Sequence, residues 1–296
     1  MIWLVGNKGM LGTELALLFE IQGLPHVGSD RDVDILDPKA LADFASGKGI
    51  TWIVNCAAYT AVDKAEDELD LARSLNATGP ENLGRLATSI GARIIHISTD
   101  YVFDGSGLRP YLESDPVAPL GAYGFTKAEG EARLVAVCPA AVIVRTAWLY
   151  GEHGPNFVYS MLRLMGQKEE LGVVADQWGS PTWTADLTRA LLAIMQAASL
   201  PSVLTSGIYH FTNAGATTWH EFAAEIEMLG REFGVLDKPC HVKAIATADY
   251  PTKTRRPAYS VLSKEKIEKT FGIKPPGWKE SLRAFAETGF GPQVKK

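Results

Sequence analysis

Short runs of consecutive apolar residues alternate with helical stretches along the first half of the chain. The apolar runs predict strands at residues 2–5, 51–55, 93–98 and 141–145, and a less apolar strand is predicted at residues 25–29. Between them apolar residues recur at helical spacing, most clearly in residues 10–22, where one stripe holds Leu11, Leu15, Leu18 and Ile21. Continuous apolar strands separated by helices are typical of a parallel sheet that helices cover on both faces. We therefore predict an α/β fold with a doubly wound parallel sheet.

The pattern changes after about Trp148. Loops become longer, and proline and glycine interrupt the chain more often. We predict that residues 1–147 form the sheet domain and that residues 148–296 mainly form a smaller C-terminal lobe. One or two elements within about 181–215 are expected to return to the sheet. Because ligands of a doubly wound fold bind at the carboxyl ends of the strands, the lobe is expected to cap that edge and to bind the substrate.

The composition excludes several classes of protein. Of the 296 residues, 46% are hydrophobic and 21% are charged, which is ordinary for a globular chain. A net charge of −5 argues against nucleic acid or an anionic membrane as partner. No apolar stretch approaches the roughly 20 residues of a membrane span, and the first apolar run is too short for a signal peptide. Three cysteines do not form a disulfide framework. We expect a cytoplasmic enzyme or binding protein.

A glycine-rich turn follows the first predicted strand. Gly6, Gly9 and Gly12 form a GxxGxxG motif that opens the helix of residues 10–22. Glycines here permit a tight turn and let backbone N–H groups and the helix N-terminus approach a pyrophosphate. Glycine turns also join strands to helices for structural reasons alone, so the motif depends on its place after a strand. It predicts a dinucleotide-binding (Rossmann) domain in residues 1–147.

Residues after the second and third predicted strands complete the expected cofactor site. Asp30 stands 24 residues after Gly6, near the spacing at which an acidic residue meets the ribose 2′-hydroxyl and favours NAD. Arg31 beside it can pair with a 2′-phosphate, so the choice between NADH and NADPH stays open. Asp34 and Ile35 follow in the next loop, where they would border the adenine. Small residues that allow close approach of the backbone leave the third strand, in the segment Ala57, Ala58, Tyr59 and Thr60.

The candidate chemistry lies in a YxxxK motif that enters a predicted helix. Its Tyr123 and Lys127 are four residues apart and so share a helical face. A nearby cation stabilises a phenolate, so we predict that Lys127 lowers the pKa of Tyr123 from about 10 toward neutrality. Thr99 ends the fourth predicted strand, in the run Ser-Thr-Asp. The three side chains are suited to proton transfer at a carbonyl beside a nicotinamide.

These motifs together resemble the extended short-chain dehydrogenase/reductase superfamily. Longer stretches are similar to the dTDP-4-dehydrorhamnose reductase family: NCAAYTAVDKAE, LNATG, STDYVFDG, YGFTKAEGE, RTAWLYG, DQWGSPT and TTWHEFA. The resemblance runs from residue 1 to about residue 285. It implies NAD(P)H-dependent reduction of the C4 ketone of dTDP-4-dehydro-L-rhamnose to dTDP-L-rhamnose, for polysaccharide biosynthesis.

The resemblance also implies roles for individual residues. Tyr123 would donate the proton to the substrate carbonyl, Lys127 would orient the nicotinamide ribose, and Thr99 would bond the reacting oxygen. Asp100 and Trp148 would contact the sugar. The superfamily's structural asparagine would be Asn76. The contacts to the dinucleotide would come from Met10, Leu11, Asp30, Asp34, Ile35, Ala58, Tyr59 and Thr60.

The nucleotide part of the substrate is expected in the second half of the chain, at Asn156, Gln177 and Arg256. An arginine there would clamp a diphosphate through two hydrogen bonds, although the pair Arg255 and Arg256 equally fits a solvated loop. Three tryptophans are interpreted as packing residues and not as stacking platforms for a base: Trp178, Trp183 and Trp219.

Metal binding and assembly are less defined. The six histidines show no HxxH or HExxH spacing, so no metal site is expected from them. Some members of the resembled family are stimulated by magnesium at a carboxylate-rich subunit contact, and Glu14 falls near that place. Its partners cannot be located in the sequence, so magnesium stays unplaced, and the chain is expected to be a monomer or a homodimer.

Two alternatives stay open. The first is another nucleotide-sugar 4-keto reductase or epimerase with the same three side chains. The second is a non-catalytic regulatory subunit resembling that of methionine adenosyltransferase, which keeps YxxxK but carries Ser-Asn where this chain has Thr99 and Asp100. A 4,6-dehydratase is disfavoured, because Tyr101 stands where those enzymes place a glutamate.

Overall fold

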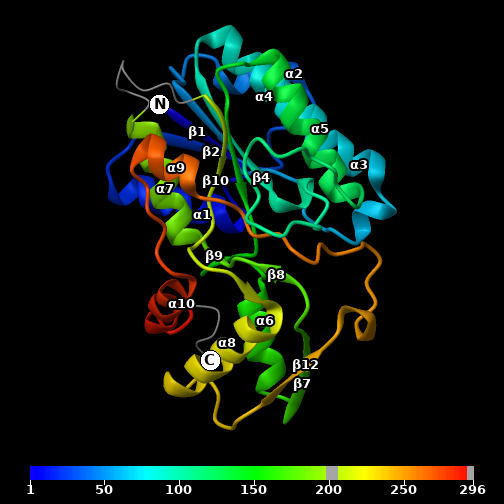
Figure 1. Ribbon diagram of the computed structural model, residues 1–296. Helices are drawn as coiled ribbons and strands as arrows, with labels where there is room; N and C mark the ends of the chain where they lie inside the picture. Colours follow the sequence, from blue (N-terminus) through cyan, green and yellow to red (C-terminus); the bar gives the residue numbers. More distant parts are fainter. Residues whose placement is uncertain (198–205, 292–296) are drawn as a thin grey trace.

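A six-stranded parallel sheet forms the centre of the computed structural model, which describes residues 1–197 and 206–291 (Figure 1). From edge to edge the strands are β10 (Gly207–His210), β5 (Val142–Thr146), β4 (Arg93–Thr99), β3 (Trp52–Asn55), β1 (Ile2–Val5) and β2 (His26–Ser29). All neighbouring pairs run parallel. The predicted α/β class with a doubly wound sheet is confirmed.

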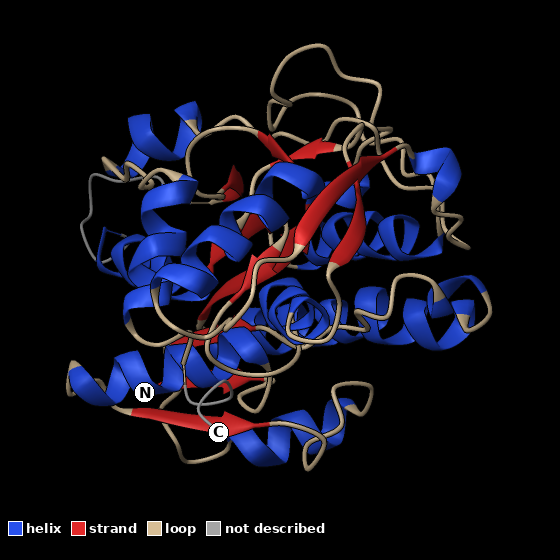
Figure 2. Cartoon of the chain, turned by 90° about the horizontal axis from the view of Figure 1, so that it is seen from below, coloured by secondary structure: helices blue, strands red, loops and turns tan. Residues whose placement is uncertain are grey.

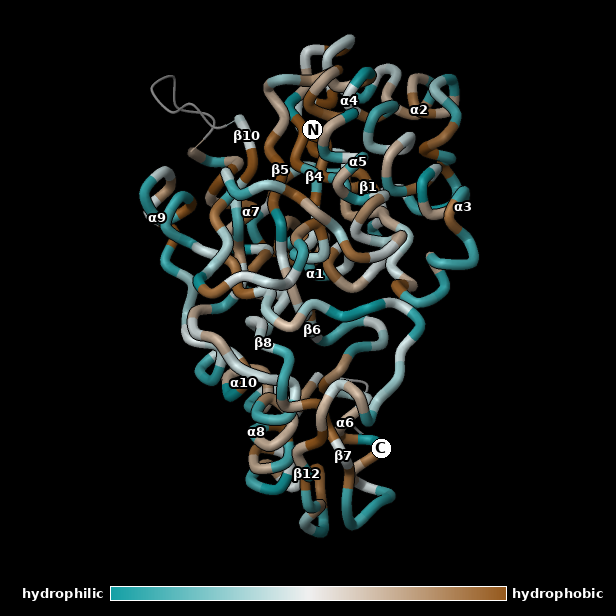
Figure 3. The backbone as a smooth tube through the Cα atoms, turned by 45° about the vertical axis from the view of Figure 1, so that its right-hand side comes forward, coloured by the Kyte–Doolittle hydropathy of each residue, from teal (hydrophilic) through white to brown (hydrophobic). Residues whose placement is uncertain are grey.

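Helices cover both faces of this sheet (Figure 2). One face packs against α1 (Met10–Ile21), α7 (Thr184–Ala197) and α9 (Glu265–Phe271), and the other against α2 (Pro38–Ala45), α4 (Gly79–Ile90) and α5 (Ala122–Val137). In β1, Trp3 and Leu4 are both fully buried but belong to cores on opposite faces, as the two-residue period of a strand requires. Figure 3 shows hydrophobic residues, in brown, along the central strands β4 and β5, which agrees with burial of the sheet on both faces.

The connection from β3 to β4 contains a break in helical geometry. It includes the short helices η1 (Lys64–Glu66) and α3 (Leu69–Arg73), followed by a single π-helical turn, η2 (Ser74–Thr78), which leads directly into α4. A π-turn widens the helix by one residue and is frequent at functional sites. The turn contains Asn76, which is fully buried.

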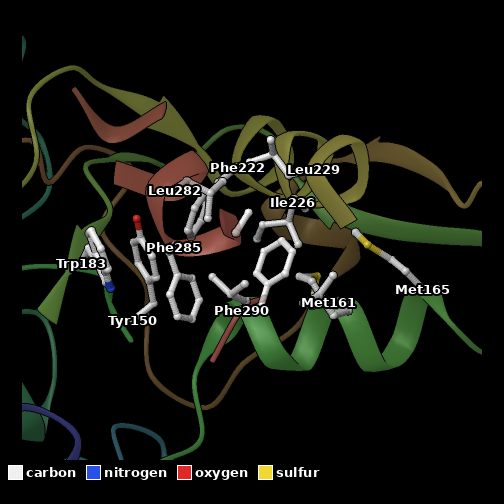
Figure 4. Packing of buried hydrophobic residues seen from close by; sticks show 14 of the residues in the cluster. Tyr150, Met161, Met165, Trp183, Phe222, Ile226, Leu229, Leu282, Phe285 and Phe290 are labelled. Atoms are coloured by element: carbon white, nitrogen blue, oxygen red, sulfur yellow. The ribbon is translucent and has the colours of Figure 1, made fainter. Parts of the chain in front are cut away.

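The second half of the chain builds a lobe beyond the end of the sheet (Figure 1). A parallel pair, β7 (Glu170–Val174) and β12 (His241–Ile245), packs with three helices, α6 (Phe157–Met165), α8 (Trp219–Glu232) and α10 (Trp278–Glu287). Their core is rich in aromatic rings, and Figure 4 shows Phe222, Phe285 and Phe290 at its centre. Each such side chain contributes about 1.5–3 kcal/mol by leaving water.

Short strands connect the lobe to the sheet. β6 (Leu149–Tyr150), where the chain leaves β5, pairs in parallel with β9 (Thr182–Trp183), where it returns toward α7. β8 (Trp178–Gly179) pairs with β11 (Thr217–Thr218) in the antiparallel direction. Two further short helices, η3 (Asp100–Val102) and η4 (Thr247–Asp249), lie in connecting segments. No helix among the described residues is long and apolar enough to cross a membrane.

Candidate active site

The carboxyl ends of the strands bring most of the predicted site residues to one edge of the sheet. Val5 is in register with Ser29 on one side and with Asn55 on the other, so the segments that follow β1, β2 and β3 start side by side. Thr99 is in register with Thr146 at the ends of β4 and β5. Residues far apart in the sequence therefore meet where a doubly wound fold places its ligands.

The glycine-rich turn is packed too closely for side chains. Gly6 has φ of +78°, and a Cβ on it would lie 2.8 Å from the backbone nitrogen of Ala57. A Cβ on Gly12 would lie 2.1 Å from the carbonyl oxygen of Gly6. The backbone N–H groups of Gly6 and Asn7 both donate to the carbonyl of Ser29, which ties the turn to the end of β2.

The N-terminus of α1 is open to an anion. Its N-cap is Gly9, no described side chain caps it, and its first turn carries no acidic residue. The first N–H groups of a helix lack partners within the helix and carry a partial positive charge. Together with the tight turn, this is the arrangement that receives a dinucleotide pyrophosphate.

The other predicted cofactor residues differ in what their side chains do. Asp34 accepts a hydrogen bond from the backbone N–H of Leu36, at 2.9 Å, and so shapes its own loop. The side chain of Ile35 is only 6% exposed and packs in the core against Gly79. The predicted adenine contact of Ile35 would therefore have to come from its backbone, because its side chain is a packing residue.

Asn76 holds the segment that leaves β3. Its side-chain oxygen accepts from the backbone N–H of Tyr59 at 2.8 Å, and its nitrogen donates to the carbonyl of the same residue at 3.1 Å. The nitrogen also lies 3.1 Å from the hydroxyl of Thr126 on α5. The amide thus fixes the backbone of the predicted cofactor segment to the helix that carries the YxxxK motif, as expected for a structural asparagine.

A polar stripe on α5 faces the sheet. Tyr123, Lys127 and Glu131 follow one another at four-residue spacing. The ammonium of Lys127 donates to the carbonyl of Ile97 at 2.7 Å. The carboxylate of Glu131 accepts from the hydroxyl of Ser98 at 2.5 Å. One face of the helix therefore matches consecutive positions of β4.

Tyr123 stands against Thr99 at the end of β4. Its partial burial, with the charge of Asp100 and the neighbouring Tyr101, raises its pKa above the ordinary value, and a hydrogen bond with Thr99 acts against this rise. The ring of Tyr101 packs edge-on against that of Tyr123, with centroids 5.6 Å apart. The prediction that Lys127 lowers this pKa is wrong for the protein chain by itself, because the ammonium is directed at β4. A phenol with a raised pKa keeps its proton at neutral pH, as a proton donor must.

Lys127 is enclosed by protein. Only 1% of it is exposed, and burial lowers its pKa to about 8, against the opposing influence of Glu131. Its Nζ lies 3.2 Å from Nε2 of His96, whose Nδ1 lies 3.0 Å from Nδ2 of Asn55. His96 and Asn55 are both fully buried. The lysine is thus held on two sides by β4.

A buried ion pair extends the stripe and was missed from the sequence. Arg145 on β5 donates through two nitrogens to the two carboxylate oxygens of Glu131, at 2.9 and 2.6 Å, and both residues are less than 5% exposed. Two signals were available: Glu131 continues the four-residue spacing of the YxxxK motif, and His96 and Ser98 interrupt an otherwise apolar strand. Buried polar residues at such positions require partners.

Asp100 follows Thr99 and is also buried. It is 2% exposed, and burial raises its pKa to about 6, although hydrogen bonds from Ser260 and Thr99 favour the carboxylate. The hydroxyl of Thr99 donates to it at 3.0 Å and accepts from the backbone N–H of Tyr101 at 3.2 Å. The Thr-Asp pair is therefore internally bonded at the predicted position of the substrate carbonyl.

Trp148 has an unusual backbone and a fixed ring. It lies two residues beyond Thr146 and has φ of +47°, which is rare for a bulky side chain. Its ring stacks on Trp219, with centroids 3.5 Å apart and planes 12° from parallel. A Cβ on Gly179 would lie 2.5 Å from the same indole. The indole is held between two elements of the lobe close to the carboxyl edge of the sheet.

The three residues predicted to hold the nucleotide have partners within the protein. Asn156 caps α6 by accepting from the backbone N–H of Tyr159. Gln177 is 7% exposed and donates to the hydroxyl of Thr247. Arg256 bonds Asp63 at 2.6 Å and Tyr101 at 3.2 Å. For Asn156 the cap gives a structural role, and a diphosphate clamp by Arg256 would require its ion pair to open.

Glu14 does not gather a set of metal ligands. Its carboxylate lies 3.7 Å from Nε2 of His153, and burial followed by the charge of Glu152 raises its pKa. Within residues 1–197 and 206–291, no group of three or more histidine, cysteine or acidic side chains is arranged to hold a metal ion. Trp183 is 8% exposed within the core of the lobe, in agreement with its interpretation as a packing residue.

Comparison with known proteins identifies the family that this chain matches. The family model described as RmlD substrate binding domain matches residues 1–289. A dTDP-4-dehydrorhamnose reductase from Aggregatibacter actinomycetemcomitans is 40% identical over 289 residues, which cover 96% of this chain and 98% of the relative.

Solved structures agree over the same length. A dTDP-4-dehydrorhamnose reductase from Clostridium acetobutylicum superposes with a TM-score of 0.91 and 41% identity, covering 98% of this chain and 99% of that one. An enzyme of the same name from Bacillus anthracis, in complex with NADP, gives a TM-score of 0.90 at 33% identity, with coverage of 97% and 98%.

Proposed function

The chain belongs to the dTDP-4-dehydrorhamnose reductase family, and on this premise we propose that it reduces the C4 ketone of dTDP-4-dehydro-L-rhamnose to dTDP-L-rhamnose at the expense of NADPH or NADH. The observation that carries the proposal is the contact of Tyr123 with Thr99 at the end of β4. This contact lies on the same edge of the sheet as the glycine-rich turn.

The residues present fit a nicotinamide dinucleotide. The glycine cradle, which a Cβ would fill, and the uncapped N-terminus of α1 suit its pyrophosphate. Asp30 and Arg31, next to the end of β2, would meet the adenosine ribose with opposite preferences for a 2′-phosphate. When bound, the nicotinamide supplies the hydride that C4 of the sugar gains.

The protein's own groups then supply and direct the proton. Tyr123, protonated at neutral pH, donates its hydroxyl proton to the carbonyl oxygen as that oxygen gains charge. Thr99 would donate its hydroxyl hydrogen to the same oxygen, which requires this hydrogen to turn away from Asp100, its acceptor in the structure. The backbone N–H of Tyr101 keeps the hydroxyl oxygen in place. Lys127, whose ammonium is bonded to Ile97 and not to Tyr123, would orient the nicotinamide ribose, and solvent restores the phenol.

The sugar would lie between Thr99 and Trp148. The fixed indole of Trp148 offers an apolar wall on the lobe side, and Asp100 offers a carboxylate on the sheet side. Gln177 and Arg256 already have partners within the protein. Gln177 donates to Thr247, and Arg256 is paired with Asp63. We therefore assign the sugar contacts to Asp100 and Trp148 first.

A direct assay tests the proposed function. The purified chain is mixed with enzymatically prepared dTDP-4-dehydro-L-rhamnose and with NADPH or NADH in separate reactions, and cofactor oxidation is followed together with the nucleotide sugar formed. We expect stoichiometric dTDP-L-rhamnose with at least one cofactor. A panel of other nucleotide-linked 4-keto sugars, each at the same concentration, tests the alternative of a different reductase or epimerase.

The regulatory-subunit alternative predicts a different outcome. Such a protein would oxidise neither cofactor with any keto sugar and would co-purify with a synthetase. The intact Thr99 and Asp100 pair favours the enzyme, because both side chains are bonded in place beside Tyr123.

A further inference from the structure

Three fully enclosed polar side chains connect the catalytic helix to the predicted cofactor segment. From α5, Nζ of Lys127 lies 3.2 Å from Nε2 of His96. On the other side of the imidazole, Nδ1 lies 3.0 Å from Nδ2 of Asn55. The side-chain oxygen of Asn55 in turn accepts from the backbone N–H of Ala57 at 3.0 Å. His96 and Asn55 are neighbours in register across β4 and β3.

The donors and acceptors present determine where the hydrogens lie in this series of contacts. Because the N–H of Ala57 needs an acceptor, the amide of Asn55 turns its oxygen to Ala57 and its NH₂ group to His96. Nδ1 of His96 must then accept, and a neutral imidazole carries its single hydrogen on Nε2. That N–H points at Nζ of Lys127, which can accept it only as a neutral amine.

A charged Lys127 requires the opposite order. An ammonium has only donors, so Nε2 must accept and Nδ1 must carry the hydrogen. This hydrogen meets the NH₂ group of Asn55 unless the amide rotates by half a turn. After that rotation the N–H of Ala57, which is half-buried, faces a donor and loses its hydrogen bond, and this disfavours the charged arrangement.

We infer that His96 is a positioning residue that couples the charge of Lys127 to the backbone of the Asn55–Ala57 turn, its two tautomers marking the charged and the neutral amine. The turn matters because Ala57 packs against Gly6 in the glycine-rich turn. The coupling thus connects the protonation state of Lys127 to the backbone that the cofactor is expected to contact. The inference uses the proposed function only for the place of Lys127 beside the reaction.

The other groups facing Lys127 do not provide this link. From β3, Cys56 has its pKa raised to about 12 by burial, so it stays a neutral thiol. From its own helix, Glu131 favours the charged amine but is saturated by Ser98 and Arg145. His96 itself stays uncharged, because burial and the charge of Lys127 lower its pKa well below the ordinary value. Only its tautomer is free to change.

Nuclear magnetic resonance of the imidazole nitrogens tests the inference without turnover. The full chain is labelled with ¹⁵N-histidine, and a His96→Asn variant assigns the resonances. We expect the hydrogen of His96 to lie on Nδ1 at about pH 6 and to move to Nε2 as the pH rises through about 8, where Lys127 loses its proton. A tautomer that stays the same up to about pH 10 would overturn the coupling.

A second experiment measures the coupling through activity. In Asn55→Asp, a carboxylate accepts from both the Ala57 N–H and the Nδ1–H, so the charged arrangement loses nothing. We expect the alkaline limb of kcat to move upward by about one pH unit, a tenfold change in proton affinity. In a His96→Phe background the same substitution should move the limb much less, because the link is gone.

Equal shifts in both backgrounds would mean that the new charge acts through space, and the inference would fail. The two experiments also separate this inference from the proposed function. A tautomer change in a chain that reduces no keto sugar would leave the coupling standing and refute the assigned reaction.

Discussion

The carboxyl edge of the sheet and the core of the lobe are both buried, but different forces hold them. At the edge, Glu131 and Arg145 are joined by paired, directed hydrogen bonds. In the lobe, rings such as Phe222 and Phe285 pack at several angles, with no hydrogen bond to orient them (Figure 4). Hydrogen bonds fix direction, whereas apolar packing fixes mainly volume.

The difference fits the work of each region. Proton transfer depends on placing a hydroxyl within hydrogen-bond reach of one atom, so Tyr123 is carried on a helix anchored at Lys127 and Glu131. A binding wall needs shape, which stacked and packed rings supply, as Trp148 on Trp219 shows. The two regions should therefore respond differently to conservative substitutions.

The largest effect is expected from removing one oxygen at the edge. Tyr123→Phe keeps the ring and its contact with Tyr101 but deletes the proton donor. We predict that kcat falls by about 10²- to 10⁴-fold while cofactor affinity and unfolding midpoint stay near those of the parent. Stopped-flow reduction and fluorescence titration with NADPH check this. A kcat within a few-fold of the parent would rule out Tyr123 as the donor.

The next effect contrasts the two cores by substitutions that preserve size. Glu131→Gln keeps the shape but leaves the buried Arg145 without a countercharge, which should cost about 3–5 kcal/mol of unfolding free energy. Leu282→Met, in the fully buried core of the lobe, should cost less than about 1.5 kcal/mol. Urea unfolding of both variants measures the difference. Equal losses of unfolding free energy would show that the polar edge is no more sensitive to size-preserving substitutions than the apolar lobe.

A smaller effect is expected at the wall of the lobe. Gly179→Val would push the indole of Trp148, because even a Cβ at this position lies 2.5 Å from it. We predict a KM for the nucleotide sugar raised about tenfold, or about 1.4 kcal/mol, with kcat changed by only a few-fold. Gly166→Ala is the matched control in the same lobe, since its nearest neighbour is 3.4 Å away. A fall in kcat with constant KM would contradict this role.

The smallest effect concerns pH at the edge. Since the pKa of Lys127 is lowered to about 8 in the folded protein, kcat should decline as the pH rises above about 8. The unfolded chain keeps that proton up to about 10.4, so the folded state binds fewer protons in this window and stability should rise with pH. Activity and stability thus change in opposite directions. Lys127→Met is the control, and it should remove this contribution to the rise.

The edge was largely predictable because its signals are local in the sequence. GxxGxxG directly after a strand and YxxxK at the start of a helix each lie within a few residues. Four of the five predicted strands, β1, β3, β4 and β5, are buried along most of their length, and this burial gives them their apolar sequence. The edge strand β2 is only partly buried. Glu131 was also within reach, one further step along the YxxxK stripe.

The rest depends on contacts between distant segments. Nothing near Trp148 in the sequence indicates that its ring stacks on Trp219, 71 positions later. The pKa of Tyr123 was predicted in the wrong direction because spacing places Lys127 on the same face but does not say that its ammonium bonds Ile97. Partners such as Asp63 for Arg256 likewise depend on the way the lobe folds back.

The π-turn of residues 74–78 shows that the helix gives up local stability for positioning. A deletion of one residue there would restore a regular helix with better hydrogen-bond geometry. It would also rotate Asn76 away from Tyr59 and release the segment after β3. The direction of one asparagine side chain therefore depends on an irregular helix, and a sequence optimised for helix stability alone would lose the hydrogen bonds between Asn76 and Tyr59.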